Sequence, residues 1–122
     1  MKRTASTLIL TAAVALFLTA CGWNPSVPEV PLTAPWDKMN LPVKEDARVW
    51  ASDDKTLKVV HKAGRREVAQ SYLDALEKGG WKLTSQPDVG EHNVTFNFEK
   101  SGQKLEVEVY DFENTGVIIE KK

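Results

Sequence analysis

The feature that most constrains the fold is a pair of alternating runs on either side of Ser101-Gly102. Each run carries three apolar side chains at every second position: Val94, Phe96, Phe98, Leu105, Val107 and Val109. A two-residue turn pairs Lys100 with Gln103, which brings all six apolar side chains to one face and sets Glu99 opposite Lys104. Because turn length, register and burial agree, the sequence predicts an antiparallel hairpin with one buried face.

One helix is expected before this hairpin. Residues 66–78 carry apolar side chains at helical spacing, and Gly79-Gly80 follows as a termination signal. The remaining runs predict two strands before the helix and two more besides the hairpin, at residues 48–52, 56–61, 81–85 and 117–121. We therefore predict an α+β fold in the order β-β-α-β-β-β-β, with one antiparallel sheet covered on one face by a single helix.

The chain begins with a segment typical of protein export. Lys2 and Arg3 precede an apolar run of about 11 residues, whereas a spanning helix needs roughly 20. Leu18-Thr19-Ala20-Cys21 ends this run and contains the only cysteine. The tetrapeptide resembles the lipobox of bacterial lipoproteins. The resemblance implies a signal peptide over 1–20 and a mature chain that begins at Cys21 with a diacylglycerol and an N-acyl chain, palmitate among them.

Lipidation sets the expected location of the protein. Acylation would consume the thiol of Cys21, which excludes a disulfide and cysteine-based catalysis. In enteric lipoproteins an Asp after the Cys favours the inner membrane, so the resemblance implies that Gly22 directs a Gram-negative protein to the outer membrane, facing the periplasm. The membrane is then a partner through the anchor, and no other cofactor is expected.

The segment over 21–41 is expected to be a proline-rich tether. Five of the six prolines lie at positions 25–42, and spaced prolines favour extended polyproline II at about 3.1 Å per residue. About twenty residues could then hold a domain over 42–122 up to roughly 60 Å from the membrane. Trp23 could sit at the headgroup level. Trp36 could either remain in the tether or fold back onto the domain as an apolar anchor.

The charge of the mature chain argues against nucleic acid. After removal of the signal, 14 basic and 17 acidic side chains remain, a net charge of about −3 with mixed signs. Nucleic-acid binding needs a concentrated basic face.

A second resemblance covers residues 72–109. Tyr72-x3-Leu76-x3-Gly80-Trp81 followed by two alternating strands is similar to a pattern in small bacterial envelope lipoproteins. Packing explains these residues, so the resemblance implies a fold and no activity.

The chain shows no recognisable catalytic or metal motif. Asp88, Glu91 and His92 cluster in an expected loop, but a metal site needs three or four converging ligands. Glu106 and Glu108 alternate with apolar neighbours and are expected on the outer sheet face. His61 alternates with strand residues and is expected at the core edge. We therefore expect no enzyme, no catalytic residues and no metal.

Strict alternation places an apolar group on the outer face of the sheet. If Val109 faces the core, Tyr110 and Phe112 point outward, and a three-residue loop at 114–116 sets Ile118 opposite Phe112, with Trp50 nearby. Such a patch often marks a partner site. Two alternatives remain: a β-bulge near 110–111 that returns Phe112 to the core, or cover by the tether.

Three functions follow from these features. The first is a lipid-anchored, non-catalytic interaction module that offers its sheet to an envelope protein. The second is a binder of a small ligand or of cell-wall glycan, with Trp50, Tyr110 and Phe112 as a stacking surface; a pocket between helix and sheet would favour it. The third is a small enzyme.

Overall fold

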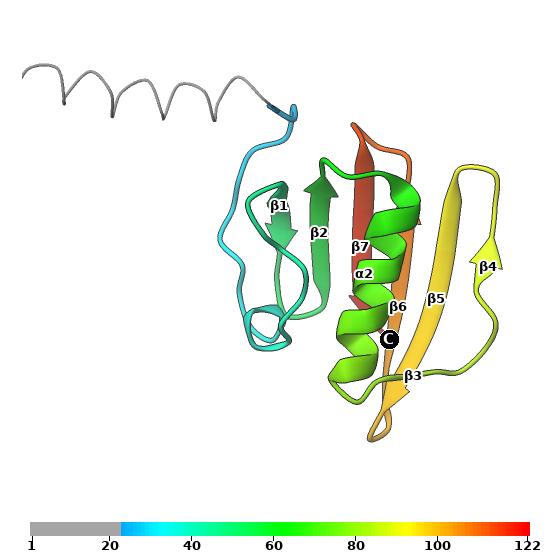
Figure 1. Cartoon of the computed structure of the whole chain (residues 1–122). Helices are drawn as coiled ribbons and strands as arrows, with labels where there is room; N and C mark the ends of the chain where they lie inside the picture. The colour runs from blue at the N-terminus through cyan, green and yellow to red at the C-terminus, as the bar shows by residue number, and fades with distance from the viewer. Residues whose placement is uncertain (1–22) are drawn as a thin grey trace, which may run out of the picture.

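The computed structural model describes residues 23–122, which form one seven-stranded antiparallel sheet and one α-helix (Figure 1). A 3-10 turn, η1 (Trp36–Lys38), comes first, and the helix α2 (Arg65–Lys78) follows the second strand. The strands in chain order are β1 (Ala47–Ser52), β2 (Thr56–His61), β3 (Lys82–Leu83), β4 (Asp88–Val89), β5 (Asn93–Lys100), β6 (Gln103–Tyr110) and β7 (Thr115–Lys121). The predicted fold class, one antiparallel sheet with a single helix, is confirmed.

The strands lie in the order β1-β2-β7-β6-β5-β3, and β4 also pairs with β5. The central hairpin has the predicted register, with Phe98 opposite Leu105 and Glu99 opposite Lys104. Ser101 and Gly102 both have positive φ, 52° and 81°, as a tight two-residue hairpin turn requires. This hairpin carries the buried face on which the rest of the domain packs.

The helix α2 begins one residue before the predicted start and ends where predicted. Val68, Tyr72 and Leu76 are its buried side chains, and they lie on one face at helical spacing. Gly80, at φ 94°, turns the chain so that the Trp81 amide donates to the Leu76 carbonyl at 3.0 Å. In the described part of the chain, no helix combines the length and apolar character needed to cross a membrane.

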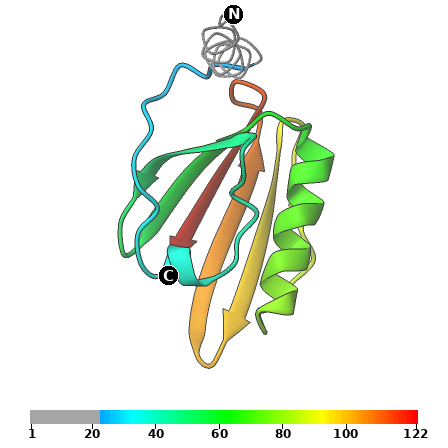
Figure 2. The ribbon, with the colours of Figure 1, turned by 60° about the vertical axis from the view of Figure 1, so that its left-hand side comes forward.

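Two kinds of segment cover the core. The helix α2 covers the sheet near β6, while the segment before β1 lies toward the β1 edge of the sheet (Figure 2). Both contribute to one continuous cluster of buried side chains, which includes Trp36, Leu57, Tyr72, Phe98, Val107 and Ile119. The domain therefore needs residues before β1 to complete its core.

This finding corrects the expected tether. The Val30 amide donates to the Val49 carbonyl at 2.9 Å, and the Thr33 amide donates to the Ser52 hydroxyl at 3.0 Å, so the segment lies along the edge of β1. Trp36 is fully buried, which confirms that it folds back onto the domain. The apolar side chains of this segment hold it on the sheet. The prediction of an extended spacer is therefore wrong for the described residues. Cover of an edge strand also blocks pairing with other chains.

The region after the helix differs from the prediction in two places. The strand expected over 81–85 is limited to Lys82–Leu83, and the expected loop contains β4. Both short strands pair with the same edge of β5, at Glu99–Phe98 and at Thr95–Val94. A strand of two residues is too short to show an alternating pattern in the sequence. Only the hydrogen-bonded pairing with β5 makes β3 and β4 recognisable as strands.

Candidate functional site

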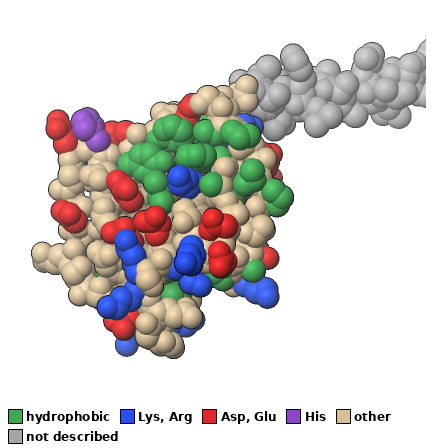
Figure 3. Space-filling view, turned by 180° about the vertical axis from the view of Figure 1, so that it is seen from behind, with side chains coloured by type: hydrophobic (Ala, Val, Ile, Leu, Met, Phe, Trp, Pro, Cys, Tyr) green, Lys and Arg blue, Asp and Glu red, His purple; other side chains and the backbone are tan. Residues whose placement is uncertain are grey.

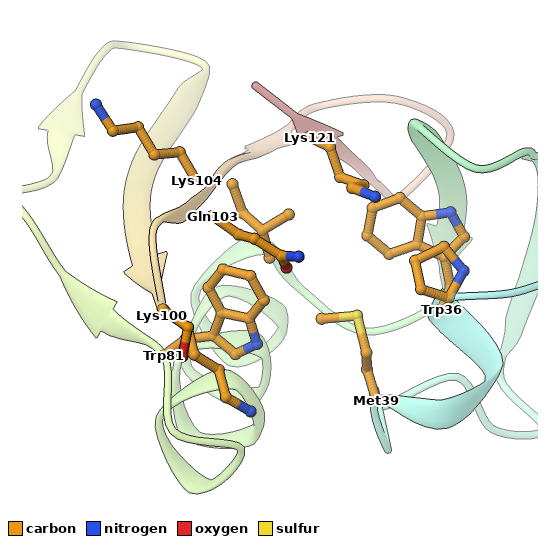
Figure 4. A pocket seen from close by; sticks show the side chains of 10 residues that line it. Trp36, Met39, Trp81, Lys100, Gln103, Lys104 and Lys121 are labelled. Carbon is orange, nitrogen blue, oxygen red and sulfur yellow. The ribbon is translucent and has the colours of Figure 1, made fainter.

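A pocket of about 300 Å³ opens at one end of the core (Figure 4). At this end of the sheet, the core-facing side chains of β5, β6 and β7 continue beyond the packed core. Lys100 pairs with Gln103, and Leu105 pairs with Lys121, so polar side chains follow the last buried ones. The pocket is lined by Pro35, Trp36, Met39, Trp81, Lys100, Ser101, Gln103, Lys104, Leu105 and Lys121.

The walls of this pocket are apolar and fixed in place. Trp36 and Trp81 stand on opposite sides of the pocket, with Met39 and Gln103 between them (Figure 4). The Trp36 Nε1–H donates to the Asp53 carbonyl at 2.5 Å. Trp36 is 0% exposed and Trp81 is 9% exposed, so Trp36 backs the wall and a ligand would meet Trp81 and the half-buried Met39 first.

The rim of the pocket is cationic. Lys100 Nζ donates to the Gly79 carbonyl at 2.6 Å, which satisfies a carbonyl at the C-terminal end of α2. Lys121 lies in the core-facing row beside Trp36, and among the described residues the lining includes no carboxylate. Apolar walls below a cationic rim fit a small molecule with an apolar body and a negative group.

A second depression runs between α2 and the β4–β5 edge. It is larger, about 610 Å³, and its lining includes Arg65, Ala69, Leu73 and Asp111. Arg65 forms an ion pair with Asp111 at 3.0 Å, and His92 Nδ1 lies 3.1 Å from the same carboxylate. Arg65 and Asp111 neutralise each other, which leaves Arg66 as the remaining charged side chain of this lining, against three lysines at the core-end pocket.

Tyr110 and Ile118 lie on the outer sheet face, as predicted, and Phe112 and Trp50 lie beside them. We call Trp50, Tyr110, Phe112 and Ile118 the outer aromatic surface. Phe112 is the centre of the ring contacts, with centroids 5.6 Å from Trp50 and 5.9 Å from Tyr110. Each of the four is partly exposed. Lys58 Nζ lies 5.1 Å from the centre of the Trp50 ring, a cation–π distance.

The pairing that was expected for this surface is wrong in one respect. Ile118 lies opposite Glu108, not Phe112, because β6 ends at Tyr110 and Tyr110 pairs with Gly116. The predicted partner, Phe112, and the observed partner, Glu108, are four residues apart. Because this is an even number, Ile118 still lies on the predicted face of the sheet. The alternative bulge near 110–111 is absent from the described β6–β7 ladder, which is regular to Tyr110. An irregularity does occur in β1, at Trp50.

Gly116 leaves room for the outer aromatic surface. A Cβ at this position would lie 2.6 Å from Cζ of Tyr110, so the ring rests directly on the glycine. We expect Gly116→Ala to push Tyr110 away and to lower the free energy of unfolding by about 1–3 kcal/mol. Chemical denaturation measures this, with Gly64→Ala as control because a Cβ there meets nothing within 4 Å. Equal stability of the two variants would contradict the contact.

His61 is more buried than predicted. It is 4% exposed, and its Nε2 lies 2.8 Å from the Tyr72 hydroxyl inside the domain. Burial lowers the pKa of His61 to about 4, against an opposing attraction to Asp46, and burial raises the pKa of Tyr72 above its usual range. The pair is therefore a neutral hydrogen bond within the core.

The remaining predicted site residues lie on the surface or outside the described part of the chain. Asp88, Glu91 and His92 are exposed, and the described chain holds no group of three His, Cys, Asp or Glu side chains suited to a metal. Cys21 lies outside the described residues, so its lipidation stays a prediction. The pocket was not predicted at all, and the one available signal was Trp36, a large apolar residue in a proline-rich segment.

Part of the chain is similar to a known protein family. Residues 62–116 match a family described as START domain-like. The matched part runs from the end of β2 through α2 and the central hairpin to the start of β7, which is less than half of the chain. No curated protein and no solved structure matches.

Proposed function

We propose that this protein is a lipid-anchored, non-catalytic cell-envelope protein whose domain binds a small amphipathic anion in the core-end pocket. The observation that carries the proposal is the combination of Trp81, Met39 and Leu105 as walls with Lys100 and Lys121 at the rim. Buried apolar walls supply affinity, and a small number of polar groups fix orientation, as in most small-molecule sites.

The size of the pocket and the comparison support ligand binding. About 300 Å³ is at the lower end of the range for small-molecule sites, which suits a medium-chain carboxylate or a ligand of similar size. The match to a START domain-like family favours a ligand-binding module over a scaffold. The matched hairpin contributes Lys100, Gln103 and Leu105 to the pocket.

Binding fits this site better than turnover. The polar groups around the pocket are lysines, a serine and a glutamine, and one of the lysines is already hydrogen-bonded to the end of α2. Nucleophilic catalysis needs a nucleophile and a base within hydrogen-bond reach of each other. The described residues that line the pocket include no histidine or carboxylate that could act as that base.

The pocket predicts a ligand-binding result with two variants. We expect the purified protein to bind 8-anilinonaphthalene-1-sulfonate, which has an apolar body and one negative group, and decanoate to displace it. Gln103→Trp should fill the pocket and weaken binding by about tenfold or more, and Lys121→Gln should weaken it by about threefold because one partly exposed charge contact is lost. Fluorescence titration measures both.

The matched control for these variants is Lys62→Gln. Lys62 is an exposed lysine in the loop after β2, away from the pocket lining, so its loss should leave the affinity unchanged. Wild-type affinity in both Gln103→Trp and Lys121→Gln would contradict the proposed site.

The anchor has its own test. We expect Cys21→Ser to abolish palmitate incorporation and to release the protein from membranes, because no thioether can form. Metabolic labelling and membrane flotation measure this. Gly22→Asp is the control that should stay lipidated and, in an enteric host, move to the inner membrane. A Cys21→Ser protein that still incorporates palmitate would contradict the lipid anchor.

A further inference from the structure

We infer that the outer aromatic surface rests on the bilayer that holds the Cys21 lipid. The inference depends on the proposed lipidation and adds an orientation to it: the outer sheet face lies against the headgroups, and the pocket is directed away from that contact. The partner is a lipid surface, and the argument starts from where the described chain begins.

The first described residues are held at the edge of this surface. The Arg48 guanidinium donates to the carbonyls of Pro25 and Val27 at 3.3 and 2.9 Å. The Ser26 hydroxyl donates to the Glu113 carboxylate, next to Phe112. Arg48 pairs with Val60 in the β1–β2 ladder. The next pair, Val49 with Val59, faces the core, so Arg48 lies on the outer face of the sheet. The chain therefore enters the domain beside the outer aromatic surface.

The distance from this point to the lipid is short. Pro25 lies four positions after Cys21, and a fully extended chain covers at most about 14 Å in four residues. Pro25 is buried, so the chain is fixed from this residue onward. A lipid on Cys21 then keeps the bilayer within about 14 Å of Pro25, instead of the roughly 60 Å that a free spacer would allow.

The chemistry of the surface suits the headgroup region. Trp and Tyr are enriched at membrane interfaces, where an apolar ring and a polar tip both find partners. Trp50 Nε1 is buried and has no hydrogen-bond partner among the described residues, and a rotation of the ring at an interface would let it donate to a lipid oxygen. Lys58 and Arg48 supply positive charge that anionic lipids attract.

The outer face of the sheet has an apolar end and a charged end, and the apolar end is the one that this orientation places against the bilayer. Hydrophobic side chains gather at the end of the face where the chain enters, and acidic and basic side chains cover much of the rest (Figure 3). Glu106 and Glu120 lie in the charged part, where Lys122 pairs with both, at 3.3 and 4.0 Å. Contact with lipid at the apolar end leaves this charged part in water.

The test uses the full lipidated protein in vesicles of phosphatidylethanolamine and phosphatidylglycerol with brominated acyl chains. Since acylation consumes Cys21, an engineered cysteine is the only thiol, and it can carry an environment-sensitive fluorophore. Lys58→Cys reports from the outer aromatic surface, Lys104→Cys from the charged end of the same face, and Gln70→Cys from the exposed side of α2. We expect at least about twofold more bromine quenching at position 58 than at position 70, with position 104 between them.

The outcomes separate the two proposals. Protein that fails to float with the vesicles contradicts the anchor and the docking together. Protein that floats but shows equal quenching at positions 58 and 70 leaves the anchor intact and overturns the docking. Shielding of position 58 from an aqueous quencher in native envelopes but not in pure lipid vesicles would assign the surface to a protein partner and also overturn it.

Discussion

Trp36→Ala is expected to lower the free energy of unfolding by about 3–5 kcal/mol. The side chain is fully buried in the main core cluster, and its Nε1–H donates to the Asp53 carbonyl. Removal leaves a large cavity and a backbone carbonyl without its donor. The change should also detach the segment before β1, because Trp36 is its largest buried side chain.

Urea denaturation followed by circular dichroism measures this loss, with Asp37→Ala as the matched control. Asp37 is the exposed neighbour in the same η1 turn, so its replacement should change the stability by less than about 0.5 kcal/mol. A Trp36→Ala protein that loses less than about 1 kcal/mol would show that the segment is not part of the core.

Stability is expected to fall by about 2 kcal/mol between pH 7 and pH 4.5 because of His61. Burial holds the pKa of His61 at about 4 in the folded protein, whereas its ordinary value is 6.5. Below pH 6.5 the His61 imidazole becomes protonated in the unfolded chain, whereas it stays neutral in the folded protein. The unfolded state is then favoured progressively until the pH approaches 4, where the folded protein is protonated as well.

Denaturation across this pH range tests the assignment. His61→Gln keeps a hydrogen-bonding group near Tyr72 but does not titrate, so this part of the pH dependence should disappear. His92→Gln, which removes the exposed histidine, should keep it. If the pH dependence is the same in the two variants, the buried neutral His61 is ruled out as its source.

The parts of the fold that were predictable depend on local patterns. The hairpin register follows from a two-residue turn and two alternating runs, and helix α2 follows from its apolar spacing and the Gly79-Gly80 stop. The outer position of Ile118 was correct for a related reason, since parity alone decides the face of a strand residue. Its partner was wrong because Asn114 and Thr115 do not form the turn.

Those two residues instead join the β6–β7 loop to the β2–α2 loop. Asn114 Nδ2 donates to the Lys62 carbonyl at 2.6 Å, and the Thr115 hydroxyl donates to the Ala63 carbonyl at 2.7 Å. The loop turns earlier, with Glu113 at φ 57°. A turn signal in the sequence does not show that its polar side chains have distant partners, which is why the loop was misplaced.

The core-end pocket depends on distant segments. Trp36, Trp81, Gln103 and Lys121 come from four parts of the chain, and their meeting depends on the sheet order, which places β7 between β2 and β6. The proline-rich composition of the first segment favoured an extended tether. The segment is extended, but its apolar side chains find an uncovered part of the core, which only the assembled sheet provides.

The most direct test of the proposed function is a two-dimensional ¹H–¹⁵N spectrum of the indole groups during titration with decanoate. The four tryptophans report from different places: Trp23 near the chain entry, Trp36 in the core, Trp50 on the outer aromatic surface and Trp81 at the pocket. We predict a progressive shift of the Trp81 signal while the Trp50 signal stays in place. A shift of Trp50 without Trp81, or no shift of any indole, would contradict ligand binding in the core-end pocket.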